Sequence, residues 1–287
     1  MTARWSADAA TAQTDAQLLA GVARDRIGLK PDLSTPKIEV LLRALPEDER
    51  DARYRELVTS EPDSARWRDF IEALLVHETY FFRHPDQLRQ LADVVLPRLL
   101  HDRLAAGSRE LRIWCAGCAS GEEVYTLALI VQTALAASAR TWNVTILGTD
   151  LSAQSLAHAR AASYTLAAGL NSFRDVPAFA RHHFSEILTA AATSWSPSAE
   201  LRRWTRFAQH NLATDPPPLH DVDLVICRNT LIYLDEPHLR SALTSLEAAL
   251  RPRGALLLGP AETVSATSTL RMVCTEQAVL WMKQASP

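Results

Sequence analysis

The 287-residue sequence lacks several features that define large classes of protein. It has four cysteines without the regular spacing of a disulfide framework, which predicts a reducing compartment rather than a secreted scaffold. No apolar run approaches the roughly 18 residues of a membrane-spanning helix. The polar N-terminus also shows no apolar core of a secretory signal. We therefore expect a cytoplasmic globular protein that does not insert into a membrane.

The chain also lacks a strong excess of charge of either sign. Thirty Lys and Arg residues stand against 33 Asp and Glu residues, so the net charge is −3. A general nucleic-acid binder would carry a basic excess, so no nucleic-acid partner is expected. With 47% hydrophobic and 22% charged residues, the composition is typical of one or two globular domains with a substantial core.

The first hundred residues show helical periodicity and no strand pattern. We expect a disordered tail at 1–13, a small all-helical domain at 14–100 and a linker at 101–110. Prolines are expected to separate the helices, and they are Pro31, Pro36, Pro46 and Pro62.

From residue 111 onward, apolar runs of strand length alternate with helical stretches, which predicts an α/β fold with a mostly parallel, Rossmann-like sheet over 111–287. The expected strands are Leu111–Cys115, Val144–Gly148, Thr205–His210, Asp223–Cys227 and Ala255–Gly259, with a late pair at Met272–Cys274 and Val279–Met282. Residues 171–203 interrupt the alternation. We expect them to form an inserted subdomain outside the sheet.

The most informative segment is the turn after the first expected strand, RIWCAGCASGEE. Gly117 and Gly121 lie close together between a strand and a helix, which is typical of a backbone that approaches a nucleotide closely. A P-loop would continue with Lys and Ser or Thr, whereas Glu122 and Glu123 follow here and would repel phosphate. Asp150 ends the second strand, where an acid can accept hydrogen bonds from both ribose hydroxyls. These features favour S-adenosylmethionine, which carries an adenosine, an ammonium group and a sulfonium but no phosphate.

Each of these residues also has a purely structural interpretation. Ser120 and Glu123 fit a helix-capping box, and Asp150 fits a helix N-cap, for which Ser152 competes. The cysteines of the turn form a CxxC pair. The sequence holds no second such pair, so packing is favoured over metal or redox chemistry and no metal site is expected.

Two further segments carry polar side chains that fit a substrate site. The segment HETYFFR follows an apolar helix, and Thr79 and Arg83 would share a face if it continued as helix. The segment RNTLIYLD follows the fourth expected strand, at the edge where open α/β sheets bind substrates. Its Arg228 and Tyr233 could hold a carboxylate. Core packing and pairing with a neighbouring acid are the alternatives.

Together these segments resemble the CheR-type chemotaxis-receptor methyltransferases. The similarity covers about residues 15–265 and rests on motifs in the order and spacing of the family. The motifs are ETYFFR at 78–83, WCAGCASGEEVYTLAL at 114–129, GTDLS at 148–152, HNL at 210–212, DLVICRNTLIYLD at 223–235 and RPRGALLLGPAET at 251–263.

The resemblance implies a class I S-adenosylmethionine methyltransferase sheet behind the helical domain. It implies methyl transfer to glutamate side chains in the cytoplasmic region of methyl-accepting receptors, which yields glutamyl methyl esters and S-adenosylhomocysteine. By position, it implies cofactor contacts for His77, Thr79, Arg83, Gly117, one of Glu122 and Glu123, Asp150, Asn211, Leu212, Arg228 and Asn229. Arg83, Arg228 and Tyr233 would face the substrate carboxylate.

The sequence departs from the family pattern at several positions. His77 stands where members often have Asn, and Val124 replaces the usual Pro after GEE. Some members grip a receptor tail peptide through a hairpin with turn glycines. Residues 170–253 contain no glycine, so such tethering is not expected. The receptor-facing helix of the family is basic, whereas here Lys37 and Arg43 have few basic neighbours.

The chemistry implied by the resemblance depends on positioning. A glutamate carboxylate is already ionised near pH 7, so no general base is required. Arg228 and Tyr233 would orient the carboxylate while one lone pair stays free. Two alternatives share the cofactor site. One is a methyltransferase for a small molecule with residues 1–100 as a lid, and the other is a non-catalytic module that senses the cofactor.

Overall fold

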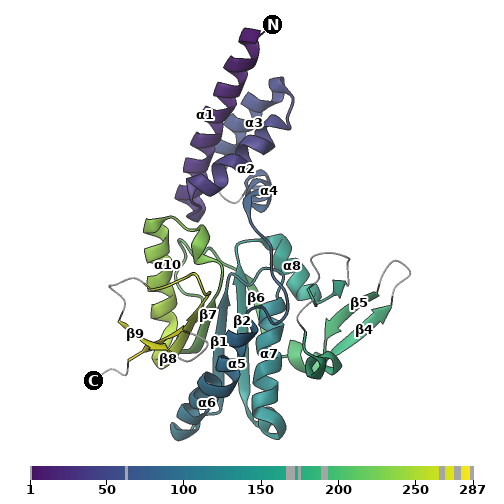
Figure 1. Ribbon diagram of the computed structural model, residues 1–287, viewed down its shortest axis with the longest axis vertical. Helices are drawn as coiled ribbons and strands as arrows, with labels where there is room; N and C mark the ends of the chain where they lie inside the picture. Colours follow the sequence, from purple (N-terminus) through teal and green to yellow (C-terminus); the bar gives the residue numbers. More distant parts are fainter. Residues whose placement is uncertain are drawn as a thin grey trace.

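The N-terminal helices form a unit of their own at one end of the molecule, at the top of Figure 1. The computed structural model describes residues 2–61, 64–165, 172–173, 176–188, 193–264, 269–274 and 279–284. The helices of the unit are α1 (Thr2–Ile27), α2 (Pro31–Arg43), α3 (Glu47–Thr59) and α4 (Ala65–Leu74). Within the described residues, no helix combines the length and apolarity needed to cross a bilayer.

The helical unit has its own hydrophobic core, which contains Leu19 of α1, Ile38 of α2 and Trp67 of α4. Two features differ from the expectation. Helix α1 begins at Thr2, so residues 2–13, expected to be disordered, belong to an alanine-rich helix. Pro36 does not separate two helices, because it lies inside α2, which continues past it although a proline removes one intrahelical hydrogen bond.

The boundary between the two cores lies near residue 75 rather than at 100. The next helical elements are α5 (Pro85–Gln90), the π-helix η1 (Leu91–Val95) and α6 (Leu96–Ala105). Their buried leucines join the core of the main sheet instead of the helical unit. The expected linker at 101–110 is correspondingly shorter, since α6 runs to Ala105 and the first strand begins at Glu110.

The main sheet contains every strand expected from the sequence. Its members are β1 (Glu110–Ala116), β2 (Asn143–Asp150), β6 (Thr205–Gln209), β7 (Val222–Cys227), β8 (Leu250–Leu258), β9 (Leu270–Cys274) and β10 (Val279–Lys283). Their order is β6-β2-β1-β7-β8-β10-β9. The pairs from β6 to β8 are parallel and β10 is antiparallel to both neighbours. The order reverses on either side of β1, and such a switch point is where open α/β sheets bind ligands.

Helices cover both faces of this sheet (Figure 1). Alternate residues of β1 point to opposite faces. Ile113 joins the core beneath α7 (Glu122–Leu135) and α8 (Ala153–Ala161), and Trp114 joins the core beneath α10 (Glu236–Ala249). The shorter elements are η2 (Ala136–Thr141), η3 (Ala178–His183), α9 (Ala199–Arg202) and η4 (Leu231–Tyr233).

The inserted segment and the residues just before it form a second, three-stranded sheet beside the main one (Figure 1). Its strands are β3 (Tyr164–Thr165), β4 (Phe184–Leu188) and β5 (Thr193–Pro197). Strands β4 and β5 pair antiparallel, with Leu188 opposite Thr193. A hairpin is therefore present although the segment lacks glycine. Four-residue connections are mostly built on type I turns, which most residues can adopt. The connection itself lies outside the described residues.

Candidate active site

A cavity of about 240 Å³ lies at the carboxyl edge of β1, β2, β6 and β7, beneath α2 and the end of α4. Most of the residues expected to form a site line this single cavity. They are Thr79, Arg83, Gly117, Glu123, Asp150, Asn211, Leu212, Arg228, Asn229 and Tyr233. His77 and Glu122 are not among its lining residues. The sheet has thus brought together segments that are up to about 150 positions apart in the chain.

The glycine turn packs tightly against the loop after β7. Gly117 has a φ of 73°, and a Cβ atom at this position would lie 2.1 Å from Oγ1 of Thr230. The backbone N–H groups of Gly117 and Cys118 both donate to the carbonyl oxygen of Thr149, at 2.8 and 2.9 Å. Only glycine fits position 117, and the close approach there exposes backbone to the cavity.

Asp150 is held at the end of β2 with part of its acceptor capacity left free. One carboxylate oxygen accepts the backbone N–H of Ala119 at 2.8 Å, and the other accepts that of Ser152 at 2.9 Å. Burial raises the pKa of the Asp150 carboxyl above its usual value. Ser152, not Asp150, is the N-cap of α8, because its hydroxyl accepts the N–H of Ser155. Asp150 therefore remains available to a ligand.

The two glutamates after Gly121 point in different directions. Glu123 lines the cavity and forms a buried ion pair with Arg228, and the thiol of Cys115 donates to it at 3.2 Å. Glu122 instead accepts hydrogen bonds from the hydroxyls of Ser120 and Ser172 and lies away from the cavity. The capping box considered for Glu123 does not form, since no side chain caps α7.

Arg228 is only 5% exposed, and its guanidinium already has partners within the protein. It pairs with Glu123, and its Nη1 donates to the carbonyl of Arg83 at 2.7 Å and to Oε1 of Gln87 at 3.3 Å. The expectation that Arg228 grips the substrate carboxylate is not supported by these contacts. The arginine lies at the floor of the cavity, where its main partner is a carboxylate of the protein itself.

Arg83 and Tyr233 are more accessible than Arg228. The segment 76–84 is not helical, so Thr79 and Arg83 reach the cavity from an irregular segment instead of one helix face. Arg83 donates to the carbonyl of Glu78 at 3.0 Å and stacks on Tyr80 with its guanidinium carbon 5.6 Å from the ring centre. Tyr233 is partly exposed, and burial raises the pKa of its phenol.

Of the remaining residues expected to contact a cofactor, Asn211, Leu212 and Asn229 line the cavity and His77 does not. Asn211 and Leu212 follow β6, and the amide of Asn211 donates to the carbonyl of Arg26 at 2.9 Å. Asn229 accepts at its Oδ1 from Nε2 of His84, 3.1 Å away, which leaves its amide nitrogen free to donate. His77, by contrast, is exposed and hydrogen bonds to the hydroxyl of Ser155 at 2.9 Å, outside the cavity.

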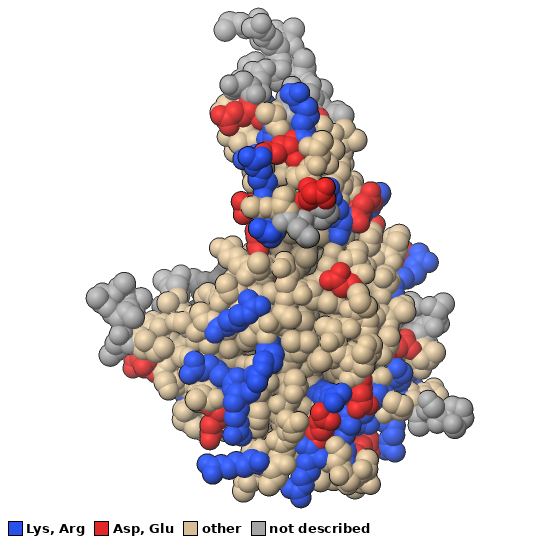
Figure 2. Space-filling view, turned by 180° about the vertical axis from the view of Figure 1, so that it is seen from behind, with Lys and Arg blue, Asp and Glu red and all other residues tan. Residues whose placement is uncertain are grey.

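The basic residues of α2, Lys37 and Arg43, have hydrogen-bond or ion-pair partners within the helical unit. Nζ of Lys37 donates to the carbonyl of Leu74 at 2.7 Å at the cavity wall, and Arg43 pairs with Glu39 at 3.3 Å. Figure 2 shows basic and acidic side chains interleaved on the helical unit. The lining role of Lys37 was not anticipated from the sequence, because a lysine on an exposed helix carries no signal that distinguishes it from a solvated one.

The cysteines near the site are packing residues. Cys115, Cys118 and Cys227 are buried free thiols, and burial raises the pKa of each well above the usual value. In the described ranges, no group of three or more His, Cys, Asp or Glu residues is arranged to hold a metal ion.

Comparison with known proteins identifies relatives of the chain. The family profile described as "CheR methyltransferase, SAM binding domain" matches residues 77–279. A probable chemotaxis protein methyltransferase of Rhizobium etli is 33% identical over 212 residues, which cover 74% of this chain and 77% of that protein. The probable biofilm formation methyltransferase WspC of Pseudomonas aeruginosa is 38% identical over 198 residues, covering 67% of this chain and 43% of that protein.

An uncharacterized 104.1 kDa protein of Rhodobacter capsulatus is 35% identical over 213 residues, which cover 74% of this chain and 21% of that protein. The chain thus spans about a fifth of this relative and about two fifths of WspC. The family match extends from the segment before Arg83 to the start of β10 and so includes all of the polar residues that line the cavity from the sheet side. The chain therefore belongs to the CheR methyltransferase family, whose cofactor is S-adenosylmethionine.

Proposed function

We propose that the chain transfers the methyl group of S-adenosylmethionine to glutamate side chains of chemotaxis-type receptors in the cytoplasm, forming glutamyl methyl esters. The observation that carries this proposal is the continuity of the cavity. Carboxylates at its floor, Asp150 and Glu123, are joined by one space to Arg83 and Tyr233, beneath α2 and the end of α4. The carboxylates at the floor would attract a cationic methyl donor, and the guanidinium of Arg83 would attract an anionic methyl acceptor.

The residues present fit S-adenosylmethionine. Each oxygen of Asp150 accepts one backbone N–H and keeps a lone pair, so the carboxylate would accept the ribose hydroxyls. Glu123 would lie near the ammonium group, and Leu212 supplies an apolar wall for the adenine. When bound, the cofactor supplies a methyl group that its sulfonium activates toward attack. His77 and Glu122 do not line the cavity and are not among the proposed cofactor contacts.

The chain's own residues would act by orienting the acceptor. Arg83 would hold one oxygen of the substrate carboxylate, and Tyr233 would donate to the same group, which leaves a lone pair free for attack. The acceptor is ionised near pH 7, so no residue needs to remove a proton. The rate advantage would come from positioning, which can supply several kcal/mol of barrier reduction. Arg228 would support Glu123 and the loop instead of the substrate.

Binding of S-adenosylhomocysteine should depend on pH through Asp150. The raised pKa of this carboxyl means that the ionised form, which can accept both ribose hydroxyls, is lost at a higher pH than for an ordinary aspartate. Affinity should be full above that pKa and should fall as the pH drops through it. Asp150→Asn should bind about 10–100-fold more weakly, from the loss of one charge-assisted pair of bonds. Calorimetric titrations over a pH series measure both effects. A variant with an unchanged pH profile would contradict the assignment.

The proposed acceptor is tested by incubating the protein with S-adenosylmethionine labelled in its methyl group and with either host membranes or a pool of host metabolites. We expect label in membrane protein, released as methanol by mild base, as for a carboxyl ester. Asp150→Asn serves as the control. Label that appears only in metabolites would favour a small-molecule methyltransferase. Tight cofactor binding without transfer to either acceptor would favour a sensing module.

A further inference from the structure

The loop between β7 and α10 carries several of the polar groups of the cavity. The polar lining residues that it contributes are Arg228, Asn229, Thr230 and Tyr233. Asn229 has a φ of 57°, a left-handed conformation that is uncommon outside glycine and that asparagine adopts more readily than most residues. Whatever fixes this loop therefore determines where these side chains point.

One carboxylate, that of Glu262, accepts hydrogen bonds from a row of backbone N–H groups. The donors are Asn229, Thr230, Leu231 and Ile232 in the loop and Gly259 after β8, at 2.8–3.3 Å. Successive N–H groups that converge on one anion form a nest, for which an ionised carboxylate is a suitable occupant. Glu262 thus satisfies backbone donors that lie at the carboxyl edge of the sheet and are not used in its strands.

The chain leaves room for this carboxylate at position 259. A Cβ atom on Gly259 would lie 2.6 Å from Oε2 of Glu262 and 2.9 Å from the backbone nitrogen of Asn229. Any larger residue would push the carboxylate and the loop apart. Gly259, which follows β8, therefore leaves the space in which the carboxylate of Glu262 lies against the loop.

The carbonyl groups of the same loop are held from the other side by Lys30, which precedes α2. Its backbone N–H donates to the carbonyl of Tyr233 at 2.9 Å, and its Nζ donates to the carbonyl of Ile232 at 2.8 Å. The anionic side chain of Glu262 thus binds the N–H groups of the loop, and the cationic side chain of Lys30 binds one of its carbonyl groups, each matching the backbone dipoles. The loop is clamped between the sheet domain and the helical unit.

We propose that Glu262 is a positioning residue: it holds the backbone of residues 229–232 in the conformation that directs Asn229 and Tyr233 into the cavity. Among the described residues, those that line the cavity do not include Glu262, so it acts through the loop. The link to methyl transfer rests on the proposed function, whereas the link to cofactor binding requires only the cavity.

The test compares wild type with Glu262→Gln by hydrogen exchange of backbone amides and by titration with S-adenosylhomocysteine. The amide NH₂ of Gln cannot accept, so at least one group of loop donors loses its partner. Exchange at residues 229–232 should accelerate about tenfold or more, and the dissociation constant should rise by about tenfold, as expected for losing hydrogen bonds to a charged group. Exchange in β1 and β2 should change by less than about twofold.

Glu236→Gln is the matched control, because its carboxylate lies just beyond the same loop but is exposed and pairs only with Arg240 among the contacts described. It should leave both measurements unchanged. If Glu262→Gln does not fold, Glu262→Asp takes its place, since the shorter side chain cannot reach both ends of the nest. Wild-type protection and affinity would overturn the proposal. Acceleration spread evenly over the chain would also overturn it, because that pattern marks general destabilisation.

These readouts separate the two proposals. Neither exchange nor binding of the demethylated cofactor needs a methyl acceptor. If no receptor is methylated by the wild type, the proposed function fails while the role of Glu262 is still decided. If methylation is found, kcat for the Glu262→Gln variant should fall by at least the same factor as its affinity.

Discussion

Replacing Arg228 with Met should lower the free energy of unfolding by about 3–5 kcal/mol, because it leaves the carboxylate of Glu123 buried without its cation. The two side chains are 2% and 9% exposed, so solvent screens the pair very little. Glu123→Gln should cost a similar amount, since it leaves the guanidinium unpaired. Urea unfolding monitored by circular dichroism measures both losses.

The double variant Glu123→Gln/Arg228→Met separates folding from binding. Removing both charges should restore most of the stability, because neither partner is left as an unpaired charge. The affinity for S-adenosylhomocysteine should stay about 10–100-fold below wild type, because no carboxylate remains near the ammonium group. Losses of stability that simply add in the double variant would contradict a direct pair.

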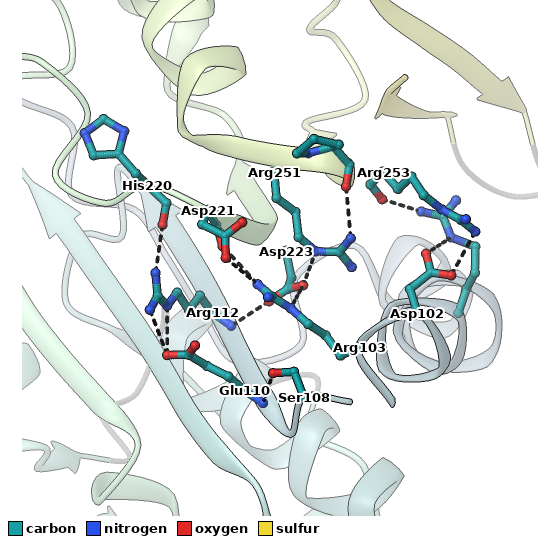
Figure 3. Close-up of polar contacts among 12 residues, drawn as sticks. Asp102, Arg103, Ser108, Glu110, Arg112, His220, Asp221, Asp223, Arg251 and Arg253 are labelled. Carbon is teal, nitrogen blue, oxygen red and sulfur yellow. Dashed lines mark hydrogen bonds and ion pairs between the residues drawn. The ribbon is translucent and has the colours of Figure 1, made fainter. Parts of the chain in front are cut away.

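Replacing Asp223 with Ala should lower the free energy of unfolding by at least about 3–5 kcal/mol. Asp223 is completely buried at the opposite end of the sheet, where Figure 3 shows arginines converging on it. Arg103 donates to it at 2.7 and 2.9 Å, Arg251 makes a further contact, and the backbone N–H of Arg112 donates at 2.9 Å. Without the carboxylate, two poorly solvated guanidinium groups would face each other.

Asp221→Asn is the matched control for this prediction, because asparagine tolerates the left-handed φ of 57° that Asp221 adopts. Its carboxylate contacts the same Arg103 at 3.1 Å but is 52% exposed, so its loss should cost no more than about 1 kcal/mol. Thermal unfolding of the two variants gives the comparison. Binding of S-adenosylhomocysteine by folded Asp223→Ala should stay near the wild-type value, because the cavity lies at the other edge of the sheet. Equal stability of the two variants would show that the network is not a stabilising one.

The fold was predictable to the extent that it depends on local pattern. Apolar runs bounded by glycine, proline and acids marked every strand of the main sheet, and the chain order of those runs indicated its class. The domain boundary was not predictable, because α5 and α6 have the same helical periodicity as the N-terminal helices. What assigns them to the sheet is that their buried leucines lie in the same hydrophobic core as residues of β1 and α7, which the periodicity of a helix cannot specify.

The location of the cavity was predictable, but the pairing of its side chains was not. The glycine turn and Asp150 pointed to the edge of the sheet at which the cavity lies, because their positions at strand ends are local features. Arg228 was expected to face the substrate, yet its partner Glu123 lies 105 positions away and is recognisable only in three dimensions. The sequence marked Glu262 only as a member of the segment RPRGALLLGPAET and predicted no contact for its side chain. An acid three residues after a strand-ending glycine was the available signal, but its five backbone partners come mostly from another loop.

The hairpin of the inserted segment shows a limit of reasoning from a missing residue type. The absence of glycine excludes the two-residue turns that need positive φ angles, but it does not exclude a longer connection. Strands β4 and β5 pair over their full length on either side of such a connection. Whether this chain binds a receptor tail peptide therefore has to be tested by a binding measurement, since the turn composition does not decide it.

We infer that the cavity is built for a cationic, phosphate-free cofactor, and calorimetric titration of the purified chain with S-adenosylhomocysteine, ATP and NAD tests this most directly. The carboxylate of Glu123 lines the cavity beside the glycine turn, at which a dinucleotide-binding sheet would hold the phosphates of its ligand. We predict that S-adenosylhomocysteine binds at least roughly a hundredfold more tightly than ATP or NAD, since juxtaposed like charges cost several kcal/mol. Tight binding of ATP or NAD with no heat from S-adenosylhomocysteine would contradict it.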